Sequence, residues 1–424
     1  MGVKTRKLGN INDSLIQWQA VVVSDGSTVT TMEAGKGYFV NNTSAAGIVK
    51  LPAAAAAGDT IAIKDYAGNF GTNNLTIQRN SHKIQGNAVD GALTGNRASV
   101  ELVYVDATKG WLYKNAVNVA DLQEANYITA TGGTITNTGD FRIHTFTGDG
   151  NFVVTKVGNP AGGPSVADYL VVAGGGGGGY QSTSGGGAGG LREAHSTPVS
   201  GSYTASPLAT PTGLTLSVQT YPVTVGGGGA GSTAAPATGT SGVNSVFSTI
   251  TSAGGGGGGS DGSGAGGNGG SGGGGANGGG PGAGNTPPVS PPQGNNGGGS
   301  SPGTPSGGGG GGAGAAGAAQ PGNSGKDGGA GVATAINPAT GVCGPGPAKY
   351  YAGGGASGSR PGTHVASGGV GGGGNGGSCN GAGTVGTANS GGGGGNGRSS
   401  GTGGCAPGRA GGKGIVIIRY KYQN

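Results

Sequence analysis

Large apolar side chains are almost absent from residues 254–414 of this chain. Apart from a few valines, this stretch has only Ile336, Tyr350 and Tyr351 as large apolar residues. A domain of that length normally folds by burying a large apolar surface, and too little is present here for an ordinary hydrophobic core. If the stretch is ordered, something other than apolar side chains must hold it together.

Cysteine is also scarce. Cys343, Cys379 and Cys405 show neither a Cys-x-x-Cys motif nor a His/Cys spacing, and the four histidines are far apart, so we expect no metal site. The cysteines are either free thiols of a protein made in a reducing cytoplasm, or one pair bridges in an oxidising medium. The start Met1–Lys7 has no apolar region behind it, and no stretch reaches transmembrane length. We therefore expect a soluble chain without a secretory signal.

Acidic residues are rare in the second part of the chain. Residues 1–173 hold 13 basic and 13 acidic residues, whereas residues 174–424 hold nine and three, so the whole formal net charge of +6 lies in the second part. Such an excess favours an anionic partner. The alternative is that a few positive charges merely keep a neutral surface soluble.

Glycine is abundant, and its position relative to strands is informative. Of 112 glycines, 91 follow Ala173, mostly in runs. Three runs follow directly on short apolar strands, and a flexible linker has no reason to begin so regularly at a strand. These junctions are Val171–Ala173 into Gly174, Val223–Val225 into Gly226 and Thr251–Ala253 into Gly254. A fourth strand, Ile415–Ile418, begins where a glycine segment ends.

An extended helix with three residues per turn explains this use of glycine. Such a helix has no internal hydrogen bonds, so its N–H and C=O groups must pair with neighbouring helices, which can approach only where Cβ atoms are absent. Gly322, Gly325, Gly328 and Gly331 recur at an interval of three, as one glycine face of such a helix would. We therefore predict a packed bundle of polyglycine II helices. The predicted tip loops between them are residues 285–292, 332–351, 360–365, 379–389 and 398–409.

The remaining segments are patterned for β-structure. The apolar and polar residues alternate at 37–40, 47–52, 59–65, 75–77, 99–105 and 111–113, and further strands are predicted at 214–218, 221–225 and 246–250. Phe141–Thr147, the turn Gly148–Asn151 and Phe152–Thr155 predict a β-hairpin. We predict an all-β and irregular fold, with small N-terminal β-modules and a β-sandwich-like frame that extends into the polyglycine II bundle. The predicted domains are an N-terminal attachment arm (1–28), a β-module (29–118), a β-hairpin segment (119–173) and a glycine-rich domain (174–424) closed by a strand at 415–422.

Motifs of catalysis lack their structural context. Gly258–Gly262 and Gly269–Gly273 match Gly-x-Ser-x-Gly, but no strand–turn–helix pattern surrounds either of them. Asp59, Asp65 and Asp106 could supply a carboxylate pair, but their places in alternating strands indicate turns and solvent-facing positions. We expect no enzyme activity, no catalytic residue and no cofactor.

Two parts of the chain, about residues 30–114 and 141–420, resemble tailed-bacteriophage fibre proteins. The first resembles a small β-module of tail fibres, through Gly37–Val40, Leu51-Pro52, Gly58–Asp65, Asn73–Ile77, Leu102–Val105 and Gly110-Trp111. The second resembles the glycine-rich domain of phage fibres, through Asp168–Gly179, Gly187–Glu193 and Gly411–Tyr420. Similar glycine packing is known from polyglycine-sandwich adhesins at phage fibre tips.

The resemblance implies a receptor-binding tail fibre that attaches the virion to the host bacterial surface through loops between glycine helices. It implies a homotrimer, a virion tail or baseplate protein as partner at the N-terminal end, and no nucleic-acid partner. The implied receptor is an anionic polysaccharide, a lipopolysaccharide or an outer-membrane protein. The implied location is a tail appendage of the virion, assembled in the host cytoplasm. The alternative is a non-adhesive structural appendage, such as a head fibre, a capsid decoration or an extracellular filament subunit.

The candidate receptor contacts are aromatic and basic residues of the predicted loops. Aromatic faces stack on sugars or apolar patches, and arginine binds phosphate or carboxylate with two donors. The candidates are Lys349, Tyr350, Tyr351, Arg360, His364, Arg398 and Arg409. The alternative for Tyr350 and Tyr351 is that they cap the end of the glycine packing.

Overall fold

The fold is all-β, as the sequence predicts. The computed structural model describes residues 16–114, 125–159, 162–181, 184–262, 264–303, 306–319, 324–359, 365–377, 381–397 and 407–423. The chain forms two compact units, residues 1–126 with 158–163, and residues 127–157 with 164–424. Within the described ranges the one helix is the four-residue α1 (Thr197–Ser200). None of the described segments is a helix long and apolar enough to cross a membrane.

Unit 1 consists of two sheets around one core. The six-stranded sheet contains β1 (Gln17–Trp18), β2 (Val22–Val23), β4 (Lys36–Asn41), β6 (Thr60–Asp65), β9 (Ser99–Asp106) and β10 (Gly110–Tyr113). The four-stranded sheet contains β3 (Val29–Thr31), β5 (Gly47–Lys50), β7 (Leu75–Gln78) and β8 (Gly91–Leu93). The chain alternates between the sheets, so β4 pairs with β6, and β5 with β7, in parallel. Their alternating apolar residues, such as Ile61, Ile63, Leu75 and Ile77, meet in the core.

The predicted strands of this unit are present, and the lead segment contributes to them. Each of the six predicted runs between residues 37 and 113 contains a strand. Strands β1 and β2, which the sequence places in the attachment arm, pair in parallel with β4 at the edge of the six-stranded sheet. Gln17–Trp18 and Val22–Val23 are therefore part of the six-stranded sheet. The rest of the predicted arm before Ile16 lies outside the described residues.

Unit 2 begins with a frame of two larger sheets, together with α1. The five-stranded sheet contains β11 (Thr129–Thr131), β14 (Gly150–Lys156), β19 (Thr220–Thr224), β20 (Ser245–Phe247) and β21 (Ile250–Ser252). The seven-stranded sheet contains β12 (Thr134–Thr138), β13 (Phe141–Phe146), β25 (Ile415–Lys421), β15 (Val166–Val172), β16 (Leu191–Ala194), β17 (Ala209–Thr210) and β18 (Leu214–Thr215). A three-stranded sheet contains β22 (Val332–Thr334), β23 (Val342–Gly344) and β24 (Gly346–Tyr351).

The two most apolar strands, β15 and β25, are neighbours and are buried on both faces. Tyr169 and Val171 of β15 belong to one core cluster, while Leu170 and Val172 belong to another. Strand β25 divides its residues between the same two clusters. A strand buried on both faces has a continuous apolar sequence rather than an alternating one, which explains the apolar runs at 169–173 and 415–418.

The predicted β-hairpin at 141–155 is wrong in its pairing. Both runs are strands, but β13 pairs with β12 and β25, whereas β14 pairs with β11 and β19 in the other sheet. Phe146 and Phe152 meet in the core between the sheets. The turn therefore carries the chain across the core. The strand predicted at 246–250 is also corrected, because it is a hairpin of β20 and β21 with Ser248 at a positive φ of 54°.

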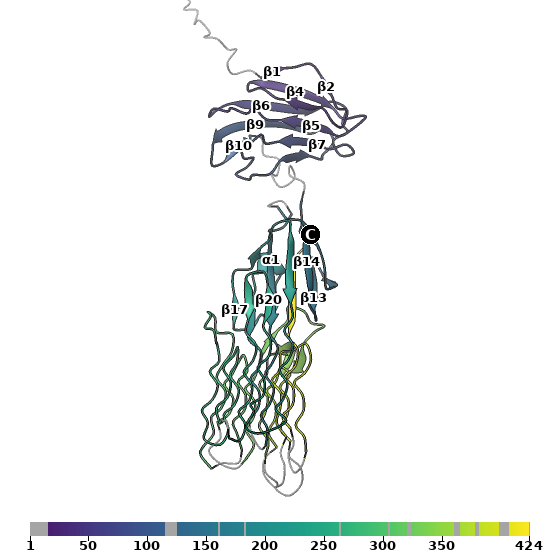
Figure 1. Ribbon diagram of the computed structural model, residues 1–424. Helices are drawn as coiled ribbons and strands as arrows, with labels where there is room; N and C mark the ends of the chain where they lie inside the picture. The colour runs from purple at the N-terminus through teal and green to yellow at the C-terminus, as the bar shows by residue number, and fades with distance from the viewer. Residues whose placement is uncertain are drawn as a thin grey trace, which may run out of the picture. The chain divides into compact units, whose positions relative to one another are not determined.

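Glycine segments continue from the frame strands, as predicted. Strands β15, β19 and β21 each end one or two residues before a glycine run, and β25 begins directly after Gly414. Figure 1 shows these segments as long, nearly parallel traces that run away from the frame and turn back at the end farthest from it. We call the extended segments between residues 173 and 414 the glycine bundle.

Backbone hydrogen bonds in the bundle have a period of three. In the run Gly174–Gly179, N–H groups three residues apart donate to the same antiparallel neighbour. The pairs are Gly174 and Gly177 with segment 240–243, Gly175 and Gly178 with segment 409–412, and Gly176 and Gly179 with segment 184–187. Carbonyl groups of the same run accept from segments 255–258, 229–232 and, through Gly176, from Gly394. One helix with three residues per turn thus contacts six neighbours, which is the hexagonal packing of polyglycine II.

The close packing explains why glycine is required. A Cβ atom on Gly176 would lie 2.2 Å from the carbonyl oxygen of Gly256, and one on Gly310 would lie 2.0 Å from that of Gly186. The interval-of-three pattern has the same cause: at Gly328 and Gly331 a Cβ would lie 1.9 Å from a neighbouring carbonyl oxygen. Both residues donate their N–H groups to segment 367–370. Gly322 of that pattern lies outside the described residues.

Candidate functional site: the distal turns of the glycine bundle

The turns farthest from the frame are built from small and polar residues. Among them, residues 233–238, 261–262, 277–278 and 302–303 are exposed. Each of them joins a glycine helix that runs away from the frame to the next helix, which runs back toward it (Figure 1). Because the rod behind them is held by backbone pairing, their side chains are not needed for a core. We call these turns the distal turns.

Buried polar side chains terminate the helices at this end. The Ser184 hydroxyl donates to the carbonyl of Gly259 at 3.1 Å, and the Asn396 amide donates to the carbonyl of Gly179. Ser184, Ser260 and Asn396 have no exposed surface. Buried carbonyl groups at the end of a helix need such partners. The Ser260 hydroxyl likewise donates to the carbonyl of Ala237. These three residues therefore fix the geometry of the distal turns. Ser184 and Asn396 have no signal in the sequence beyond their place next to a glycine run, and Ser260 is the serine of the Gly258–Gly262 motif, where it has a structural role.

The segment 332–351, predicted as a tip loop, is at the opposite end of the bundle. It forms the sheet of β22, β23 and β24, and Tyr351 has no exposed surface and packs with Ile143 and Ile417 of the frame. The helix after Tyr351 runs eight residues to Ser359 at the distal end, a length of roughly 25 Å. Tyr351 is thus a core residue, which removes it from the candidate receptor contacts. A second predicted tip loop, 285–292, also lies at the frame, where Gln293 accepts a hydrogen bond from the N–H of Ala253.

The structure separates the remaining candidates. Tyr350 is half-buried, with its hydroxyl donating to Pro345 at 3.0 Å, and Lys349 donates to the Cys343 sulfur at 3.2 Å; both lie at the frame end. Arg409 lies at the distal end, half-buried, and its Nε donates to the carbonyl of Gly383 at 3.1 Å. The structure therefore does not bring Lys349 or Tyr350 together with Arg409. The other three candidates, Arg360, His364 and Arg398, lie outside the described residues.

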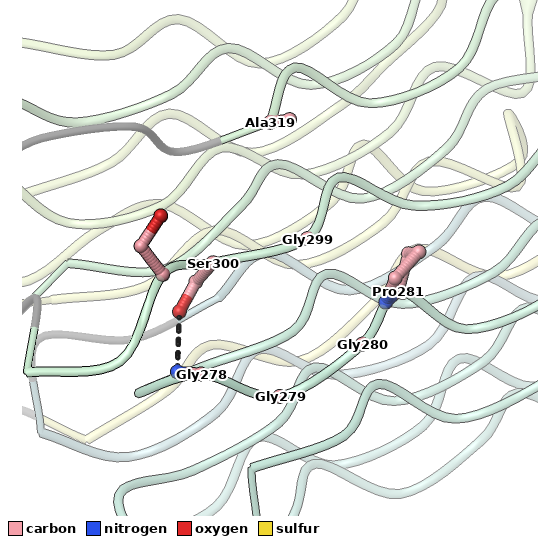
Figure 2. A pocket seen from close by; sticks show the side chains of 8 residues that line it. Gly278, Gly279, Gly280, Pro281, Gly299, Ser300 and Ala319 are labelled. Carbon is pink, nitrogen blue, oxygen red and sulfur yellow. Dashed lines mark hydrogen bonds between the residues drawn. The ribbon is translucent and has the colours of Figure 1, made fainter.

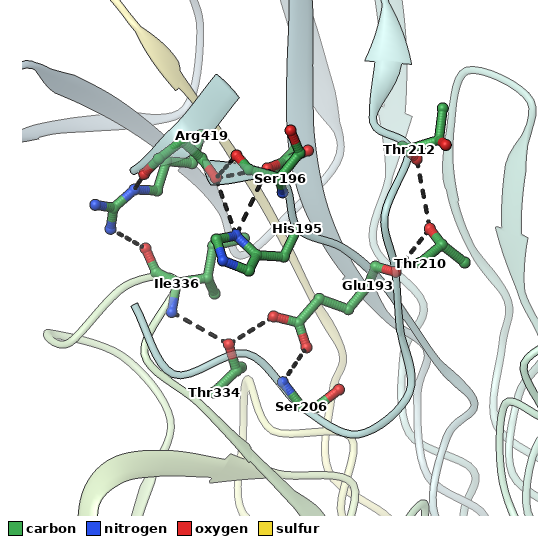
Figure 3. A network of polar contacts seen from close by, with 11 residues as sticks. Glu193, His195, Ser196, Ser206, Thr210, Thr212, Thr334, Ile336 and Arg419 are labelled. Atoms are coloured by element: carbon green, nitrogen blue, oxygen red, sulfur yellow. Dashed lines mark hydrogen bonds and ion pairs between the residues drawn. The ribbon is translucent and has the colours of Figure 1, made fainter. Parts of the chain in front are cut away.

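A buried polar network in the frame has the residue types of a catalytic site but not the geometry. Asp168 of β15 accepts from the Ser196 N–H at 2.6 Å and the Ser200 hydroxyl at 2.5 Å (Figure 3). The Nδ1 atom of His195 lies 3.8 Å from the Asp168 carboxylate and 3.3 Å from the Ser200 hydroxyl. In a catalytic triad the histidine lies between the carboxylate and the serine. Here the carboxylate binds the serine directly, and Ser200 has no exposed surface. The network positions α1 against the sheet.

Two carboxyl groups of this network are buried without a hydrogen bond from an arginine or a lysine. Burial raises the pKa of Asp168 to about 6 and also raises the pKa of Glu193. Glu193 accepts from the Thr334 hydroxyl at 2.6 Å and from the Ser206 N–H at 3.1 Å (Figure 3). Arg419 donates instead to the carbonyl oxygens of Ser200 and Ile336, at 2.8 and 2.9 Å. The network thus joins β15, β16, β22 and β25.

Ligand-binding features in the described ranges are few. No group of three or more His, Cys, Asp or Glu side chains there could hold a metal ion. An open pocket of about 490 Å³ lies at the side of the bundle near its distal end (Figure 2). Its walls are the segments 278–281 and 299–301, and the Ser300 hydroxyl accepts from the N–H of Gly278 at 3.1 Å.

Comparison with known proteins addresses the glycine-rich unit. A search of curated proteins finds no match to the chain. The profile of the family described as "Glycine-rich domain" matches residues 147–421, which is well over half of the sequence. The match begins near β14 and ends in β25, so it covers most of the frame as well as the whole bundle. The chain belongs to the glycine-rich domain family.

Proposed function

We propose that the chain is a tail fibre of a tailed bacteriophage and attaches the virion to the host bacterial surface through its distal turns. The observation that carries this proposal is that different parts of unit 2 form its rigid scaffold and its exposed turns. Main-chain pairing makes a rod without a side-chain core, and the rod ends in exposed turns whose side chains take no part in a core. Binding residues are commonly placed on loops that a rigid scaffold positions.

The proposal includes the assembly and location of the protein. Unit 1 connects to a tail or baseplate protein, the fibre is a homotrimer, and the protein has a binding rather than an enzymatic role. The receptor is a host surface component: an anionic polysaccharide, a lipopolysaccharide or an outer-membrane protein. The resemblance of both parts of the chain to phage fibres supports this assignment, together with the positive charge of residues 174–424.

The test uses the full-length protein and the bacterium that the virus infects. Fluorescently labelled protein is expected to adsorb to host cells, to leave resistant mutants that lack the receptor unlabelled, and to lower the number of plaques when added before the virus. Val365→Arg, at an exposed distal position, is compared with Val218→Arg at an exposed frame position. The distal substitution should weaken adsorption more than the frame substitution. Absence of adsorption to the host overturns the proposal.

Antibody labelling of intact virions tests the location. Gold particles at the tail support a tail fibre. Label on the head, or on filaments outside the virion, would instead identify a structural appendage without an attachment role.

A further inference from the structure

One helix at the side of the bundle has a donor face that its own chain leaves unpaired. In segment 294–300, Asn295 and Gly298 donate to segment 309–312, and Gly297 and Ser300 donate to segment 279–282, both with antiparallel order. By the same period of three, the third face carries the N–H groups of Asn296 and Gly299. Neither N–H has an acceptor among the described residues. The inner run at 174–179, in contrast, donates from all three faces.

This face opens onto the pocket of Figure 2. Gly299 lines the pocket, and Asn296 lies one turn farther along the same face. Gly280 lines the opposite wall, and a Cβ placed there would meet nothing within 4 Å. No charged side chain lines the pocket. The groove is therefore an open position at the edge of the helix packing, next to the unpaired N–H groups of Gly299 and Asn296.

We propose that this groove binds an extended, uncharged peptide with three residues per turn, which adds to the bundle as one further helix. The N–H groups of Asn296 and Gly299 are three residues apart, so a matching ligand presents carbonyl oxygens at the same interval, about 9 Å. A β-strand repeats its outward groups every two residues, at about 7 Å, and does not match. A peptide that continues the packing of the bundle must therefore adopt a helix with three residues per turn.

The chemistry of the groove narrows the ligand further. A charged segment would lose hydration without gaining a counter-ion. Proline-rich peptides adopt the required conformation in advance and have carbonyl acceptors but few N–H groups that would need partners in the groove. The groove has no aromatic wall on which a sugar ring could stack. A proline- and glycine-containing segment of a partner protein is therefore the occupant that fits. This inference goes beyond the proposed attachment role and does not depend on it.

Fluorescence anisotropy with the full-length protein tests the proposal. The probe is a labelled nine-residue peptide of Pro-Pro-Gly repeats, and the control peptide has the same length with glutamate in every third position. We expect saturable binding of the first peptide only. Gly280→Val should weaken binding at least tenfold, because its side chain occupies the groove while the added Cβ meets no atom of the chain within 4 Å.

The matched control is Gly227→Val, since a Cβ at this position of another exposed segment also meets nothing within 4 Å. This variant should bind the peptide as the unsubstituted protein does, and both variants should keep its unfolding temperature. The proposal is overturned if the peptide does not bind at millimolar concentration, or if Gly280→Val leaves its affinity unchanged. It is also overturned if no peptide binds and light scattering shows that Gly280→Val converts an oligomer into a smaller species. That result would mean that a second copy of the chain occupies the groove in the unsubstituted protein.

Discussion

Thr334 donates its hydroxyl to the carboxyl group of Glu193 at 2.6 Å, although 141 residues separate them in the chain. Both groups are buried, Glu193 on β16 and Thr334 on β22. Glycine helices lie between these strands along the sequence, and the bundle thus returns to the frame at a fixed point. The frame and the bundle therefore stabilise each other, and substitutions in either should affect the whole unit.

Glycine inside the bundle should not tolerate even a methyl group. Gly176→Ala would place Cβ 2.2 Å from the Gly256 carbonyl oxygen, so we expect a loss of about 3 kcal/mol or more in the free energy of unfolding of unit 2. Gly227→Ala is the control, because its Cβ meets nothing within 4 Å and alanine reduces the freedom of the unfolded chain. Denaturant titrations of both variants measure the difference. Equal stability of the two variants would contradict the packing described.

Unit 2 should become more stable on mild acidification through Asp168. Its pKa is raised to about 6 by burial, against 3.8 for an ordinary aspartate, so the native state binds the proton more tightly than the unfolded state. Stability from this group therefore rises as the pH falls from above 6 towards 4, and falls as the pH rises through 6. Asp168→Asn should flatten this part of the profile. Unfolding temperatures of both proteins between pH 4 and 8 measure it, and a parallel pair of curves would contradict the prediction.

The two adjacent tyrosines should differ strongly. Tyr351 is fully buried between the frame and the bundle, so Tyr351→Ala should cost about 3–5 kcal/mol. Tyr350 is partly exposed and its hydroxyl bonds only a nearby carbonyl, so Tyr350→Ala should cost about 1 kcal/mol or less. Chemical denaturation of each variant checks the ranking. Similar losses would show that Tyr351 is not part of the core.

Asn396 should control the order of the distal turns. Asn396→Ala removes the donor to the buried carbonyl of Gly179, at a cost of about 1–3 kcal/mol. Hydrogen exchange of peptides covering residues 174–181 and 391–397 should become faster, while frame peptides remain protected. Asn277→Ala is the control, since Asn277 is exposed and its amide binds the exposed Asp261 at 2.9 Å. Unchanged exchange in both variants would contradict the capping role.

The sequence predicts where the strands and glycine helices lie along the chain better than it predicts which of them pair with one another. Strand positions such as 169–173 and 415–418 follow from apolar runs, and the helical glycine packing follows from the strand-to-glycine junctions. The partner of each strand depends on contacts far along the chain, so the local turn at 148–151 gave the wrong pairing for β13 and β14. For the same reason, the sequence does not show that segment 332–351 lies at the frame end of the bundle. Its few apolar residues, among them Ile336 and Tyr351, are the ones that fill the frame core.

The candidate site was predicted less well than the fold. Aromatic and basic residues suit recognition, but Tyr351 is needed for packing, and the side chains that shape the distal turns are serine and asparagine. Short polar residues beside glycine runs are common in this sequence. Only the three-dimensional arrangement shows which of them close the end of a helix.

The period of three in the bundle's hydrogen bonds has an evolutionary consequence. Since the interior glycine helices pair with their neighbours mainly through main-chain groups, one glycine helix can replace another with few compensating side-chain changes. Gain or loss of two consecutive glycine helices at the edge of the bundle would add or remove one distal turn and leave the positions of the other turns unchanged. Recombination between related genes could therefore exchange whole turns, and the surface presented by the distal turns could change while the fold of the bundle stays the same.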